Sequence, residues 1–124
     1  DPAVARQTGA HAVDNLSSKV VRQLVKGAAD GYLSSEDGHH NYTDGMKKIE
    51  VPIFFVVGGL DQMAPPAVMV EAFRKVQSKD KRIEILSRAN GYAHDYGHVD
   101  LVLGKTAPRE VFPLLEQWLM QHEG

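Results

Sequence analysis

An aspartate and a histidine, each placed after a strand-like segment, are the residues best suited to acid–base chemistry. Asp61 follows the apolar residues 51–57 by way of two glycines, and His98 lies 37 positions further along, in a glycine-containing loop. A carboxylate bonded to an imidazole holds the ring in one tautomer and stabilises its charged form. If the fold brings Asp61 and His98 together, His98 can act as a general base that Asp61 orients.

The elements around these two residues predict that they meet. Apart from Pro52, residues 51–57 are β-branched or aromatic, and the segment is apolar on both faces, which is typical of a central parallel strand. A helix is predicted from Pro66 and a shorter strand over residues 82–86. Two parallel strands joined by a helix have their carboxyl ends at the same edge of the sheet, about 4.8 Å apart. We therefore expect the Asp61 carboxylate close to the His98 ring.

Helical periodicity marks three further segments. Residues 17–30 predict an amphipathic helix, with Ser17 or Ser18 as its cap and Gly31 as its stop. A polar loop and a short helical turn near residues 42–49 follow it. The last helix begins or bends near Pro113. Its predicted core face consists of Val111, Leu114, Leu115, Trp118 and Leu119.

A metal site is the competing interpretation of the histidine-rich loop. His94, Asp95, His98 and Asp100 form the pattern H-D-x-x-H-x-D, and imidazole and carboxylate suit zinc, manganese or iron. Two glycines in the loop over residues 87–98, Gly91 and Gly97, argue against a helix, so the four-residue spacing does not place both histidines on one face. We therefore predict no metal and no cofactor. Asp100 is instead expected to steady the loop by binding its backbone.

Composition excludes several function classes. The chain has 124 residues, 43% of them hydrophobic and 24% charged, which is typical of one globular domain. Its formal net charge is −2, without long charged blocks, which argues against a nucleic-acid or anionic-membrane partner. The absence of cysteine excludes disulfides, thiolate catalysis and cysteine-bound zinc. No apolar run approaches the roughly 20 residues of a membrane span, and nothing in the sequence indicates a cellular compartment.

Two motifs in this order resemble a known family. The segments GGLDQMAPP (residues 58–66) and YGHVDLVLGKTAPREVFPLLEQWL (residues 96–119) resemble the end of an α/β-hydrolase, in the lipase and esterase branch with helical caps. The resemblance implies that Asp61 is the triad acid and His98 the triad base. It implies an α/β fold in which residues 51–124 are the C-terminal strand-helix-strand-helix part of the core. Residues 1–50 would be a helical cap-like segment and its connecting loop.

The nucleophile of that family is not found in this sequence. It lies in a Gly-x-Ser-x-Gly turn, and none of the six serines here has those flanking glycines. The triad order Ser, Asp, His implies that the turn and the oxyanion hole belong upstream of residue 1. We therefore expect a C-terminal segment of a hydrolase of carboxylic esters, inactive alone, whose small-molecule or lipid ester substrate meets only the whole parent. The serines are Ser17, Ser18, Ser34, Ser35, Ser78 and Ser87.

Other interpretations stay open at this point. The chain could be a non-enzymatic remnant of a hydrolase that self-associates or binds another protein. An acyltransferase or a polyester synthase would carry the same Asp and His. Because residues 51–57 look like a strand paired on both edges, and only one partner strand is evident, we expect a homodimer or association with the missing N-terminal part.

Overall fold

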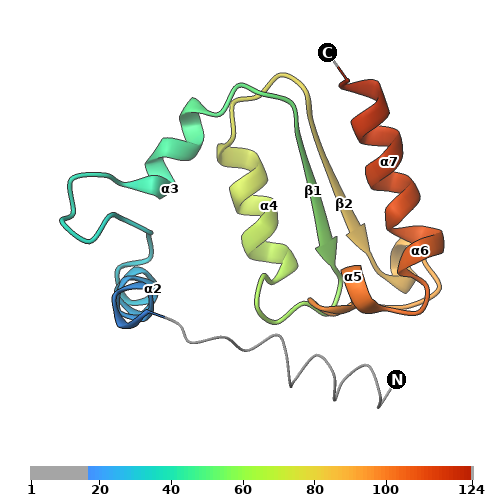
Figure 1. Ribbon diagram of the computed structural model, residues 1–124, viewed down its shortest axis with the longest axis horizontal. Coiled ribbons are helices and arrows are strands. Elements are labelled where there is room, and N and C mark those ends of the chain that lie inside the picture. Colours follow the sequence, from blue (N-terminus) through green and yellow to red (C-terminus); the bar gives the residue numbers. More distant parts are fainter. Residues whose placement is uncertain (1–16, 124) are drawn as a thin grey trace. The chain divides into compact units, whose positions relative to one another are not determined.

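The computed structural model describes residues 17–123 of the chain (Figure 1). The chain divides into two compact units, Asp1–Met46 and Lys47–Gly124. The protein is of the mixed α/β class, with a two-stranded parallel sheet and several helices. Within the described part, no helix is both long and apolar enough to cross a membrane.

The first unit contains the predicted amphipathic helix. Helix α2 covers Ser18–Asp30, and the Ser17 hydroxyl accepts a hydrogen bond from the Lys19 N–H at its start. Gly31 ends the helix in the left-handed conformation, at φ 74°, which glycine adopts without a steric penalty. A single antiparallel bridge between Ser34 and Asn41 closes the polar loop. The short helices α3 (Tyr42–Gly45) and η1 (Met46–Lys48) follow, as predicted.

The sheet of the second unit consists of two parallel strands. Strand β1 covers Ile53–Gly58 and β2 covers Lys81–Leu86, in register from the pair Ile53 and Lys81 to the pair Gly58 and Leu86. Helix α4 (Pro66–Lys75) connects them, with Pro66 in its first turn. The prediction of a strand-helix-strand unit with parallel strands is confirmed.

Helices α4 and α7 flank the strand pair (Figure 1). Side chains of successive strand residues point to opposite faces, and β1 uses this alternation at two phenylalanines. Phe55 meets Phe73 of α4 edge-on, with ring centroids 5.8 Å apart. Phe54 instead meets Trp118 of α7 (Phe112–Gln121), at 5.3 Å. Both faces of the sheet are therefore covered by a helix.

The predicted core face of α7 is only partly correct. Helix α6 (Ala107–Glu110) precedes α7, which begins at Phe112 with Pro113 in its first turn. Trp118 packs on the sheet as predicted, but Leu119 is 63% exposed and Leu115 is 38% exposed. Consecutive helical residues are about 100° apart around the axis, so Leu119 leaves the face that Trp118 occupies.

The most deeply buried cluster lies beyond the carboxyl end of β2. It combines Leu86, Tyr96, Ala107 and Val111, each at most 1% exposed. These residues come from β2, the loop after it, α6 and the start of α7. Helix α5 (Asp100–Leu103) lies near the strand ends (Figure 1). The loop that contains His98 therefore contributes Tyr96, two positions before the histidine, to the core.

Candidate acid–base site

The turn after β1 is tied to the loop that contains His98. The Leu60 N–H donates to the Tyr96 carbonyl at 2.9 Å, and the Asp61 N–H donates to the Gly58 carbonyl at 3.1 Å. The first bond joins the two loops that follow the two strands. The second closes the turn so that Asp61 lies beside the strand end.

Glycine at position 58 permits this close approach. A Cβ atom built on Gly58 would lie 2.5 Å from the Tyr96 carbonyl oxygen and 3.1 Å from that of Gly97. Both are backbone atoms, which cannot rotate away as a side chain can. Any side chain here would therefore separate the two loops.

Asp61 bonds in two directions at once. Its side chain is only 2% exposed, and its Oδ1 accepts the N–H groups of Met63 and Ala64, both at 2.8 Å. Its Oδ2 lies 2.8 Å from Nδ1 of His98. Asp61 therefore has two roles: one carboxylate oxygen stabilises the turn, and the other bonds His98. The predicted pairing at the ends of neighbouring parallel strands is confirmed.

The surroundings of Asp61 favour its charged form. Burial raises the pKa of Asp61, but hydrogen bonds from Ala64, His98 and Met63 lower it by more. The net pKa lies below the usual value of 3.8. Asp61 is therefore an anion at neutral pH, and its Oδ2 can accept a hydrogen bond from the Nδ1–H of His98.

His98 presents its second nitrogen away from Asp61. A carboxylate only accepts hydrogen bonds, so the contact at Nδ1 requires the hydrogen to be on Nδ1. The neutral ring then has an unprotonated Nε2, and its side chain is 49% exposed. Within residues 17–123, no hydrogen bond links this nitrogen to a serine. The arrangement therefore presents an oriented base at an accessible position.

The buried Tyr96 anchors the His98 loop through its hydroxyl group. The Tyr96 hydroxyl donates to Glu110 Oε2 at 2.5 Å and accepts from Thr106 at 2.7 Å. Burial and the Glu110 bond raise the pKa of Tyr96, so the hydroxyl stays protonated. Glu110 also accepts the Ala93 N–H at 3.0 Å. The sequence pattern did not single out Tyr96 or Glu110. The loop that contains Tyr96 and helix α6, which contains Glu110, meet only after folding.

The histidine-rich loop does not gather into a metal site. Asp95 accepts the Arg88 N–H and Asp100 accepts the Gly97 N–H, both at 2.9 Å. Asp100 thus steadies the loop, as predicted. Among the described residues, no group of three ligand-type side chains could hold a metal ion.

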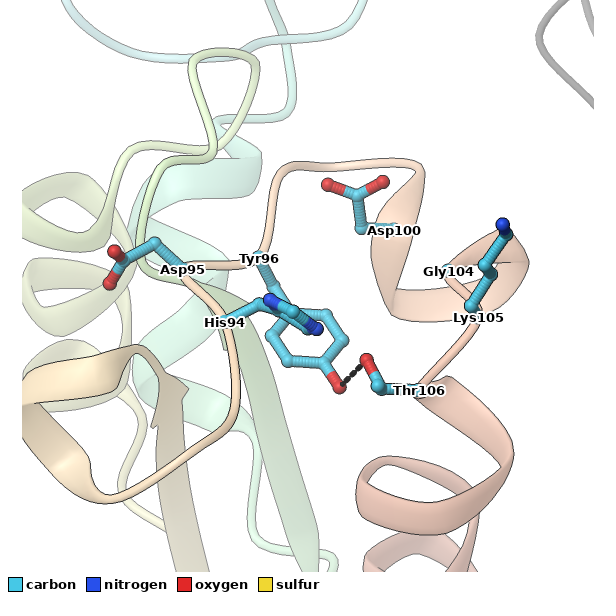
Figure 2. Close-up of a pocket in the computed structure, with 7 residues that line it drawn as sticks. All are labelled: His94, Asp95, Tyr96, Asp100, Gly104, Lys105 and Thr106. Carbon is cyan, nitrogen blue, oxygen red and sulfur yellow. Dashed lines mark hydrogen bonds between the residues drawn. The ribbon is translucent and has the colours of Figure 1, made fainter. Parts of the chain in front are cut away.

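A small pocket lies beside this loop, with a volume of about 210 Å³. Figure 2 shows Tyr96 directed at Thr106, and it shows the carboxylates of Asp95 and Asp100 on different sides of the pocket. The charged groups therefore do not converge on one point. The lining consists of His94, Asp95, Tyr96, Asp100, Gly104, Lys105 and Thr106.

Among residues 17–123, no serine hydroxyl is hydrogen-bonded to His98. Ser78 is buried and bonds the backbone of Asp80, and Ser34 lies in the bridge of the first unit. The site consequently offers an acid and a base for proton transfer but no activated hydroxyl among the described residues.

Comparison with protein-family models, with curated proteins and with solved structures gave no match to this chain.

Proposed function

We propose that this chain supplies the acid and the general base of a serine hydrolase that acts on carboxylic esters. The observation that carries the proposal is the 2.8 Å contact between Asp61 and His98 Nδ1, with Nε2 left open. It is supported by the order of the two motifs and by their place at the ends of two parallel strands. The nucleophilic serine and the oxyanion-hole donors would come from residues outside these 124.

The roles follow from the protonation states. His98 Nε2 takes the proton of the serine hydroxyl as its oxygen attacks the ester carbonyl, and then gives that proton to the departing alcohol. In the second half, Nε2 takes a proton from water, which attacks the acyl-enzyme, and returns it to the serine. Asp61 stays ionised throughout and stabilises the imidazolium.

Apolar side chains beside the two residues favour a substrate with an apolar acyl part. Leu60 and Met63 next to Asp61 are 66% and 78% exposed. Val99 and Val102 next to His98 are 48% and 65% exposed. These exposed side chains, adjacent in the chain to the acid and the base, are the apolar groups that we propose would contact the acyl part.

A second candidate is a non-enzymatic module that associates through its sheet. Strand β1 has one strand partner among the described residues, so its other edge keeps unpaired backbone groups. Val51, just before it, is 67% exposed. A second copy of the chain, or the remainder of a parent hydrolase, could pair with this edge.

The decisive experiment uses the chain joined to its upstream coding sequence. If that product contains a Gly-x-Ser-x-Gly turn, it should hydrolyse p-nitrophenyl butyrate. His98→Ala and Asp61→Asn should each lower kcat by about 10⁴-fold, whereas His39→Gln, an exposed histidine of the first unit, should leave it unchanged. An upstream frame without the serine turn would support the second candidate instead. Hydrolysis that survives His98→Ala would contradict the role of His98 as the general base.

A further inference from the structure

A second histidine–carboxylate pair lies at the end of the sheet opposite to the candidate site. His122 closes the C-terminal end of α7, and Asp80 directly precedes β2. His122 Nε2 lies 2.8 Å from Asp80 Oδ2, and Nδ1 lies 2.7 Å from the Trp118 carbonyl oxygen. The pair therefore joins two elements that are 42 positions apart in the sequence.

Both ring nitrogens of His122 face atoms that can only accept hydrogen bonds. A carbonyl oxygen and a carboxylate have no hydrogen to give, so each contact needs an N–H from the ring. Only the doubly protonated imidazolium has both. A neutral ring keeps one of these bonds and leaves the other contact between two acceptors. The contact to Asp80 also loses its charge attraction.

The two histidines differ in how many of their ring nitrogens are hydrogen-bonded. His98 has one acceptor partner and keeps Nε2 open, which suits proton transfer. His122 has both nitrogens bonded, and its side chain is only 20% exposed. His122 is thus suited to hold two elements together when it is charged.

We propose that His122 is a pH-operated clasp, which fastens the end of α7 to the start of β2 when protonated and releases it when neutral. The charged neighbours are consistent with this role. Asp80 is the group that bonds the ring, whereas the Lys81 ammonium is directed to the carbonyls of Phe73 and Val76.

Of the other charged side chains, Arg82 is engaged elsewhere, whereas Lys79 and Glu123 adjoin the pair along the chain. Arg82 lies over the Phe54 ring at 4.9 Å and bonds Glu84 at 3.0 Å. Glu123 follows His122 in the chain and adds a negative charge at the helix end. No cation among the described contacts opposes protonation of His122.

The direction of the pH effect follows from the contacts. The Trp118 carbonyl, followed by the Asp80 carboxylate, raises the pKa of His122 above its ordinary value of 6.5. A raised pKa in the folded state means that the stabilisation is complete below the ordinary value. It is lost as the pH rises through the raised value. The clasp therefore opens as the pH rises through a value above 6.5.

The chain contains its own reporter of this event. Trp118 is the one tryptophan of the sequence, and its ring stacks on the His122 ring at 4.0 Å between centroids. A protonated imidazole in contact with an indole quenches its fluorescence more strongly than a neutral one. Tryptophan emission should therefore rise as His122 loses its proton.

The test is a fluorescence titration of the full chain from about pH 5 to about pH 9. We expect one rise in emission with a midpoint above 6.5. The rise should be absent in His122→Gln and should shift to lower pH in Asp80→Asn. His39→Gln, which removes an exposed histidine of the other unit, should titrate like the unchanged chain. Asp80 is 58% exposed in its side chain, so its replacement leaves the core intact.

Hydrogen exchange then distinguishes release of the helix end from titration alone. The His122 N–H donates to the Leu119 carbonyl at 2.9 Å, and its protection factor should fall above the midpoint. A flat titration, a rise that persists in His122→Gln, or an unshifted midpoint in Asp80→Asn would overturn the proposal. Protection that stays constant across the midpoint would overturn the release of α7.

Discussion

Replacing Gly58 by alanine tests whether the close approach of the two loops holds the Asp61–His98 pair together. The added Cβ would lie 2.5 Å from the Tyr96 carbonyl oxygen, which is well inside van der Waals contact. Gly58 is not among the described residues with positive φ. Alanine is therefore tolerated by the backbone angles at this position, and the expected effect is purely steric.

The magnitude follows from the contacts that must give way. Forcing an extra methyl group into a packed interior costs about 1–3 kcal/mol. Separating the loops also removes the bond from Leu60 to Tyr96, worth about 1 kcal/mol. The reduced freedom of the unfolded chain offsets about 0.5 kcal/mol. We expect Gly58→Ala to lower the free energy of unfolding by about 1.5–3.5 kcal/mol, with a fall in Tm of roughly 6–28 °C.

Two measurements report on this variant. Urea unfolding followed by Trp118 fluorescence gives the free energy of the unit that contains the site. The Nδ1 proton of His98, shared with Asp61, should give a downfield NMR signal that disappears in Gly58→Ala and in Asp61→Asn.

Gly91→Ala is the matched control. Its Cβ meets nothing within 4 Å, but its φ of 91° is unfavourable for alanine. It should cost about 1 kcal/mol and keep the His98 signal. Stability of Gly58→Ala equal to that of the unchanged chain, or a His98 signal that persists in it, would refute the steric reasoning.

Four further outcomes are expected. The isolated chain should hydrolyse p-nitrophenyl acetate no faster than background; a clear rate that His98→Ala abolishes would contradict this. Burial and the Glu84 bond raise the pKa of Tyr92 to about 12, so the stability it contributes is complete below about pH 10 and is lost as the pH rises through about 12. Because the pKa of Tyr96 is raised as well, phenolate absorbance should show more than one late tyrosine, and Tyr92→Phe should remove the step near pH 12. Dialysis against a chelator should leave Tm unchanged, since no three ligand-type side chains gather among the described residues; a large drop would restore the metal interpretation. Light scattering at micromolar concentration should show a dimer, whereas a folded 13.7 kDa monomer would mean that the β1 edge needs no second chain.

The sequence was sufficient for the element boundaries that depend on local chemistry. Ser17 and Gly31 delimit α2 because a side-chain cap and a left-handed residue act within one helical turn. Pro66 and Pro113 lie in the first turns of their helices, where a missing N–H has no consequence. These signals need no knowledge of what the helices pack against.

The meeting of Asp61 and His98 was also predictable, for a topological reason. Parallel strands joined by one helix have their carboxyl ends at the same edge, whatever their side chains. Two residues that follow such strands are therefore confined to a small region. That constraint led to a contact over 37 positions without any knowledge of the intervening packing.

Other contacts were decided only by the tertiary structure. The rotation of α7 about its axis determines that Trp118 packs on Phe54 while Leu119 is exposed, and both are equally apolar in the sequence. The same rotation and the length of α7 bring His122 to Asp80. Periodicity indicates that α7 has an apolar side. That side is wider than the part of the helix surface that contacts the sheet, so some of its apolar residues, such as Leu119, stay exposed. Only the packed neighbours select which of its residues are buried.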